Sequence, residues 1–112
     1  MSERNLEDIL YEEYVKNGYE ENWNRAREAL KPLGLEHIVD LAEVGLFVTE
    51  ISEMMEELRM PQVDMKKLEK EGADIAIRVS NFLKCNGLSM YKGMREKHLI
   101  NMQREKLHGK KI

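Results

Sequence analysis

Two short acidic motifs, Glu50-Ile51-Ser52-Glu53 and Glu71-Gly72-Ala73-Asp74, lie 17 residues apart in the middle of the chain. Both stand in segments with helical apolar spacing, and side chains three residues apart on a helix point to one side. Two such helices packed together would offer four carboxylates to one cleft. Neighbouring acids repel one another and need cations, and hard oxygen ligands suit Mg²⁺ or Mn²⁺. The stretch therefore predicts a divalent-metal site between two helices, with ligands Glu50, Glu53, Glu71 and Asp74.

The composition is that of a single soluble helical domain spanning residues 1–112. Charged residues make up 35% of the chain and hydrophobic residues 42%, with only two prolines and 6% aromatic residues, which favours helix over sheet. A single cysteine, Cys85, excludes an internal disulfide framework and a four-cysteine zinc site. The amino end lacks an apolar signal core, and no apolar run approaches membrane-spanning length. We therefore expect a cytoplasmic protein with no membrane partner.

The net charge of −3 hides an asymmetry between the two ends of the chain. Residues 88–112 hold seven Lys or Arg and two Glu, a net charge of +5, which leaves −8 for the first 87 residues. An acidic body with a basic carboxyl end suits a metal site beside an anion site. Two solvated faces that happen to segregate would give the same totals.

Five helical segments are predicted from apolar spacing and stop signals. Asn17-Gly18 ends the first, Pro32 limits the second, and Asp64 and Ser89 are N-cap candidates for the last two. The expected helices are residues 3–16, 20–31, 35–59, 65–85 and 90–107. They predict an all-α, four- to five-helix bundle that is completed by dimerisation, because so short a chain would leave much of its apolar surface exposed.

The long third helix carries a predicted apolar stripe of Phe47, Ile51, Met54 and Leu58, with Glu50, Glu53 and Glu57 along one edge. Acids beside an apolar stripe would lie at a helix–helix seam, where a metal could bind them. The alternative is that these side chains simply reach past the seam into water, as glutamates at stripe borders often do.

The order of these motifs resembles the MazG-type nucleotide pyrophosphohydrolases of the all-α NTP pyrophosphatase superfamily. The resemblance rests on the acidic helix from Thr49 to Arg59, on the second acidic segment from Glu71 to Asn81, and on a carboxyl-terminal Lys…Asn…Arg…His-Gly-Lys pattern. That pattern consists of Lys97, Asn101, Arg104, His108, Gly109 and Lys110. The resemblance as a whole covers residues 35–112, and residues 1–34 match nothing in the family.

The resemblance implies a MazG-like fold and hydrolysis of a nucleoside triphosphate, ribo or deoxy, to the monophosphate and pyrophosphate, for nucleotide-pool housekeeping. Mg²⁺ is the expected cofactor, with Mn²⁺ possible, and a homodimer or homotetramer the expected assembly. From the residues, one of the metal-binding acids or Glu57 would orient the attacking water. The expected catalytic residues are Glu50, Glu53 and Glu57, and the substrate-binding residues are Asn81, Lys97, Asn101, Arg104, His108 and Lys110.

A different class of function fits the same features. A non-catalytic helical nucleotide-binding or interaction module would use the acids as a solvated seam and the basic end as a contact for an acidic partner. Nucleic acid is not the expected partner, because the overall charge is negative and the basic end lacks interleaved aromatic residues beyond Tyr91. Turnover of a nucleoside triphosphate with Mg²⁺ would separate the two classes.

Overall fold

The computed structural model describes residues 5–108, and the side chains of residues 5–104. Within this part of the chain the secondary structure is helical, with no strand. Five α-helices and one short 3₁₀ helix follow one another: α1 (Leu6–Lys16), α2 (Tyr19–Leu30), η1 (Lys31–Leu33), α3 (His37–Leu58), α4 (Met65–Cys85) and α5 (Met90–His108). The prediction of an all-α protein with five helical segments is confirmed.

Local capping explains most of the helix boundaries. The Asp64 side chain accepts a hydrogen bond from the backbone N–H of Lys67 at 3.1 Å, and the Ser89 hydroxyl accepts one from Lys92 at 3.1 Å. Both satisfy donors that a helix start leaves without partners. Between α1 and α2 the chain turns at Gly18, whose φ of 84° lies in the left-handed region that favours glycine.

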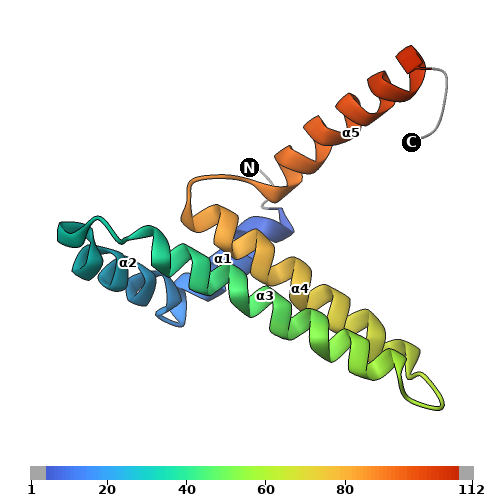
Figure 1. Cartoon of the computed structure of the whole chain (residues 1–112), viewed down its shortest axis with the longest axis horizontal. Coiled ribbons are helices and arrows are strands. Elements are labelled where there is room, and N and C mark those ends of the chain that lie inside the picture. Colours follow the sequence, from blue (N-terminus) through green and yellow to red (C-terminus); the bar gives the residue numbers. More distant parts are fainter. Residues whose placement is uncertain (1–4, 109–112) are drawn as a thin grey trace.

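The centre of the fold is the hairpin of α3 and α4, which lie side by side along their lengths (Figure 1). The α1 helix packs on α4, and α2 packs on α1 and α3. Near the end of α4, Glu7 of α1 accepts hydrogen bonds from the Ser89 hydroxyl at 2.7 Å and from the Tyr91 N–H at 3.1 Å. Beyond this anchored start, α5 projects away from the other helices (Figure 1).

The α3–α4 seam is apolar but only half-buried. Phe47 meets Phe82 edge-on, with ring centroids 5.9 Å apart, and the Met54 side chain lies against Gly72, where an added Cβ would be 3.5 Å from its terminal carbon. Among the described residues, none of the large hydrophobic side chains is fully buried. The hairpin therefore has a seam rather than an enclosed core.

The predicted apolar stripe of α3 is partly buried and partly exposed. Phe47 and Met54 face α4, whereas Ile51 and Leu58 are 44% and 55% exposed. The two exposed residues belong to a second stripe with alternating steps of three and four residues. This α3 apolar stripe, between 41% and 64% exposed, consists of Leu41, Val44, Val48, Ile51, Met55 and Leu58.

Every helix in the described part of the chain is too short or too polar to cross a membrane.

Candidate metal centre and the adjoining pocket

Three of the four predicted metal ligands come together at the α3–α4 seam. Glu50 and Glu53 of α3 and Glu71 of α4 each place a carboxylate oxygen within 4.8 Å of the other two. The first two are neighbours on one helix face because they are three residues apart, and the hairpin brings the third alongside. We call these three residues the carboxylate cluster.

The electrostatics of the cluster favour a cation. The neighbouring carboxylates, Glu50 first and then Glu71, raise the pKa of Glu53 above its ordinary value of 4.5, with desolvation adding to the effect. In addition, Oε2 of Glu71 is buried and has no hydrogen-bond partner among the described residues. A buried carboxylate oxygen without a donor is unfavourable, and a bound cation would supply the missing partner.

The spacing of the oxygens also fits a small divalent ion. Octahedral Mg²⁺ holds its ligands at about 2.0–2.1 Å, so opposite ligands are about 4.2 Å apart, and larger ions accept longer distances. A cluster within 4.8 Å is close to this separation. The donor set is all-oxygen, as Mg²⁺ and Mn²⁺ prefer. The carboxylate cluster therefore fits the predicted metal.

Asp74 stands outside the cluster. It is exposed and lies on the wall of a neighbouring pocket, together with Glu50. The structure thus brings three of the four predicted acids within 4.8 Å of one another.

Arg78 of α4 forms an ion pair with Glu50, a member of the carboxylate cluster. Its Nε donates to Oε1 of Glu50 at 2.8 Å, in an ion pair whose side chains are 43% and 12% exposed. Arg78 is thus an ion-pair partner that joins α4 to α3 at the edge of the cluster. Because a metal and Arg78 would compete for the same carboxylate, metal binding would loosen the ion pair.

Glu57, which the sequence suggested as a catalytic acid, contacts the turn between α3 and α4. Its side chain is buried, Oε2 accepts a hydrogen bond from the Asp64 N–H at 2.9 Å, and Oε1 lies 3.5 Å from Nζ of Lys67. These contacts close the turn between α3 and α4. Glu57 is thus engaged by the backbone of the turn, and it is not a member of the carboxylate cluster.

A pocket of about 720 Å³ opens beside the cluster, between the α3–α4 hairpin and the two amino-terminal helices. Its polar lining includes Glu50, Asp74, Arg78 and Asn81, and its aromatic lining includes Tyr14, Tyr19, Trp23 and Phe82. The predicted substrate residue Asn81 is 7% exposed, and its Oδ1 is buried without a hydrogen-bond partner. The structure therefore places Asn81 in the wall of the pocket that Glu50 and Asp74 also line.

The aromatic wall is the part of this region that the sequence did not assign to a site. The rings of Tyr14 and Tyr19 stack with centroids 5.4 Å apart. The Trp23 indole N–H donates to Asp40 at 2.9 Å, and the Arg27 guanidinium lies 4.7 Å from the centre of its ring. A signal was available, since four of the seven aromatic residues fall between positions 11 and 23.

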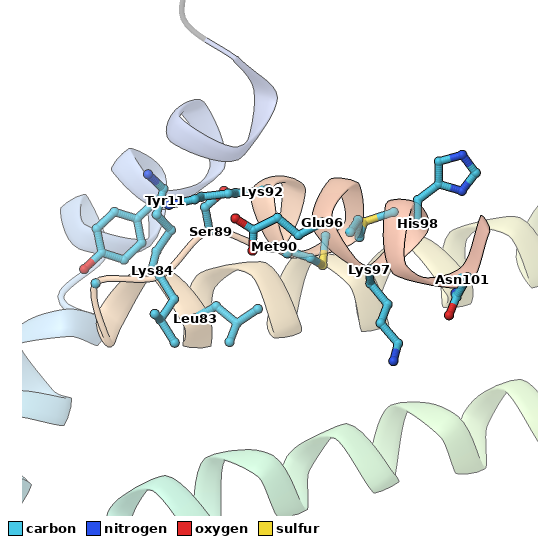
Figure 2. A pocket seen from close by; sticks show the side chains of 14 residues that line it. Tyr11, Leu83, Lys84, Ser89, Met90, Lys92, Glu96, Lys97, His98 and Asn101 are labelled. Carbon is cyan, nitrogen blue, oxygen red and sulfur yellow. The ribbon is translucent and has the colours of Figure 1, made fainter. Parts of the chain in front are cut away.

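Among the described residues of the basic carboxyl end, none lines the pocket beside the acids. Lys97 and Asn101 point to the same side of α5, while His98 points to the other (Figure 2). Lys97 and Asn101 line a second cavity of about 990 Å³, apart from the pocket beside the acids and bounded by α5, the end of α4 and Tyr11 of α1. Arg104 is exposed on the projecting helix. The His108 side chain and Lys110 lie outside the described residues.

Comparisons of the chain with family models, with curated proteins and with solved structures found no match.

Proposed function

We propose that this protein is a Mg²⁺-dependent nucleoside triphosphate pyrophosphohydrolase of the MazG type. The observation that carries the proposal is the carboxylate cluster, in which acids from two helices converge within 4.8 Å and one buried oxygen has no partner. The adjoining pocket adds a cavity of a size suited to a small organic ligand. Together they provide a place for a metal next to a place for a nucleotide.

In this proposal Glu50, Glu53 and Glu71 hold the metal. When bound, Mg²⁺ neutralises charge on the phosphate oxygens and lowers the pKa of a coordinated water. Asp74, exposed at the edge of the pocket, is the acid left free to orient the attacking water. The water oxygen attacks the α-phosphorus, the bond to the bridging oxygen breaks, and the nucleoside monophosphate, pyrophosphate and one proton leave.

Arg78 would serve the phosphate chain. It lines the pocket, and in the metal-free chain it is held by Glu50. Once a metal takes that carboxylate, the guanidinium can turn to phosphate oxygens, which it binds well because of its planar set of donors. Lys97 and Arg104 would also bind phosphate. Because α5 projects away from the other helices of its chain (Figure 1), they would act on the site of another copy.

Self-association belongs to the same proposal. The chain exposes 9149 Å², whereas a compact monomer of 13.2 kDa exposes about 6,400 Å². Its radius of gyration of 17.7 Å likewise exceeds the value of about 13 Å for a compact domain of this length. The surplus of about 2,700 Å² is larger than the roughly 800 Å² that each partner buries in a standard interface. In a homodimer or a dimer of dimers, the exposed α3 apolar stripe would be covered by another copy of the chain.

A panel of canonical and modified nucleoside triphosphates tests the proposal, with phosphate and pyrophosphate measured separately. We expect pyrophosphate as the first product with Mg²⁺ or Mn²⁺, and no turnover in EDTA. Glu53→Gln should lower turnover by about a hundredfold or more, as losses of charge-stabilising groups do. The control is Glu56→Gln, whose side chain is 73% exposed and paired with Arg59 at 3.0 Å. Orthophosphate as the first product would reject the cleavage position, and no turnover on any triphosphate would reject the enzyme.

A further inference from the structure

We propose that the aromatic pocket beside the carboxylate cluster binds the nucleobase, and that α1 and α2 are there to build it. This inference rests on the proposed function, and it gives a role to the amino-terminal residues that match nothing in the family. The ligand class is a nucleotide whose base carries an N–H donor, with its phosphates directed to the acidic end of the pocket.

The walls of the pocket have the chemistry that a base requires. Aromatic rings stack on bases with little regard to sequence, because every base has a flat π-face. Tyr14 stacks on both Tyr11 and Tyr19, so Tyr19 ends a stack of three rings at the turn between α1 and α2, and Trp23 stands one helix turn further along. Bases are flat, and flat apolar walls of this kind complement them better than they complement sugars or phosphates.

Trp23 is held in place before any ligand arrives. Asp40 of α3 accepts the indole N–H and also pairs with Arg27, whose guanidinium covers one face of the ring. Only the other face and the ring edge remain for a ligand. A side chain fixed by contacts on two helices loses little freedom on binding, which favours affinity.

Asn81 supplies the polar contact that rings cannot give. The side chain is more than nine-tenths buried, it lines the pocket, and its Oδ1 has no hydrogen-bond partner among the described residues. An unpaired buried acceptor is unfavourable, so a ligand that donates a hydrogen bond to it gains on binding. The amino group or ring N–H of a base is such a donor.

The position of the pocket orients the ligand. Glu50 belongs both to the carboxylate cluster and to the lining, so the metal would sit at one end of the cavity and the rings at the other. A nucleotide with its base against Tyr19 and Trp23 would therefore extend its phosphates toward the acids and Arg78. The volume of about 720 Å³ has room for a nucleoside.

Trp23 is the only tryptophan in the chain, so its fluorescence reports directly on this pocket. The full-length protein is titrated in EDTA with each common nucleoside monophosphate, and with ribose 5-phosphate as the base-free probe. We expect a saturable change in emission with at least one nucleoside monophosphate and none with ribose 5-phosphate. Tyr19→Ala should weaken this binding by about tenfold through loss of stacking. The matched control is Tyr91→Ala, which removes an exposed tyrosine from α5.

Asn81→Leu separates recognition from folding. If Oδ1 awaits a ligand, this variant should melt at or above the temperature of the unchanged protein and bind about tenfold more weakly, because an unpaired polar group is removed together with the contact. A lower melting temperature with unchanged binding would overturn the role of Asn81.

The outcomes distinguish this inference from the function on which it rests. Equal responses to ribose 5-phosphate and to nucleoside monophosphates, or no saturable response to any of them, would overturn the base pocket. Triphosphate hydrolysis in that case would leave the proposed enzyme standing. Saturable, base-dependent binding without hydrolysis would support the pocket and reject the enzyme.

Discussion

Replacing Glu57 with alanine should destabilise the protein by about 2–4 kcal/mol. The hydrogen bond from the Asp64 N–H to this buried carboxylate contributes about 1.5–3 kcal/mol, as bonds to charged groups do. The ion pair with Lys67, whose side chain is 61% exposed, adds no more than about 1 kcal/mol. At about 4 °C per kcal/mol for a chain of this length, the melting temperature should fall by about 8–16 °C.

Thermal unfolding followed by circular dichroism, at one fixed protein concentration and in EDTA, measures this loss. Lys67→Met is the matched control, because it removes only the exposed partner and should lower the stability by less than about 1 kcal/mol. A Glu57→Ala protein within about 0.5 kcal/mol of the unchanged one would refute the reasoning, since that is the range of neutral surface substitutions.

The same position tests the catalytic role that the sequence suggested. Glu57→Gln keeps an acceptor for the Asp64 N–H, so it should fold with a smaller loss and retain turnover within a few-fold. A Glu57→Gln protein that folds normally and loses turnover by about a hundredfold would return Glu57 to the catalytic residues.

Two further predictions concern the cluster and the exposed face of α3. In the absence of metal, Glu53→Gln should raise the melting temperature at neutral pH, because its neighbours raise the pKa of Glu53 and its charge therefore opposes folding. The gain should vanish below about pH 4.5, where the carboxyl is protonated in the folded and unfolded states alike, and a gain that persists there would exclude this cause. Val48→Glu, in the α3 apolar stripe, should convert a dimer or larger assembly into monomer in light scattering at micromolar concentration, while Ala42→Glu on the opposite face should not. A monomeric unchanged protein would reject self-association.

The helices were predictable from the sequence because their signals are local. Asp64 and Ser89 cap the helices that they were expected to cap, and the turn at Asn17-Gly18 falls where glycine permits it. The expected ends differ from the observed ones by at most three residues, and both ends of α4 coincide. Each of these boundaries depends on contacts within about one helix turn, which is the range over which a sequence pattern is informative.

The buried part of α3 was harder to predict, because the apolar arc of this helix is wide. Spacing alone joined Phe47 and Met54, which pack against α4, to Ile51 and Leu58, which are 44% and 55% exposed. Which side is buried depends on where α4 docks, and that is a contact between segments far apart in the chain.

The same limit explains the differences at the site. Glu50 and Glu53 are neighbours because they are three residues apart on α3, and the turn between α3 and α4 brings Glu71 to them. Whether Glu71 or Asp74 faces the seam depends on how α4 packs against α3, and that is a contact between segments far apart in the chain. Likewise, the tyrosines and Trp23 became a pocket wall only because α1 and α2 fold back onto the hairpin.

A single chain holds the acids, Arg78 and the aromatic wall of the site, while five of its 18 Lys and Arg residues lie on α5, which points away from the other helices (Figure 1). A triphosphate carries several negative charges, and Arg78 alone, already paired with Glu50, cannot balance them. In the proposed function, the metal at the carboxylate cluster and the α5 helix of another copy would add positive charge. The exposed apolar face of α3 gives that second copy a reason to dock, because docking removes apolar area from water. Assembly and catalysis would then depend on each other, and a variant that dissociates the chains should lose triphosphate turnover while it keeps the base pocket.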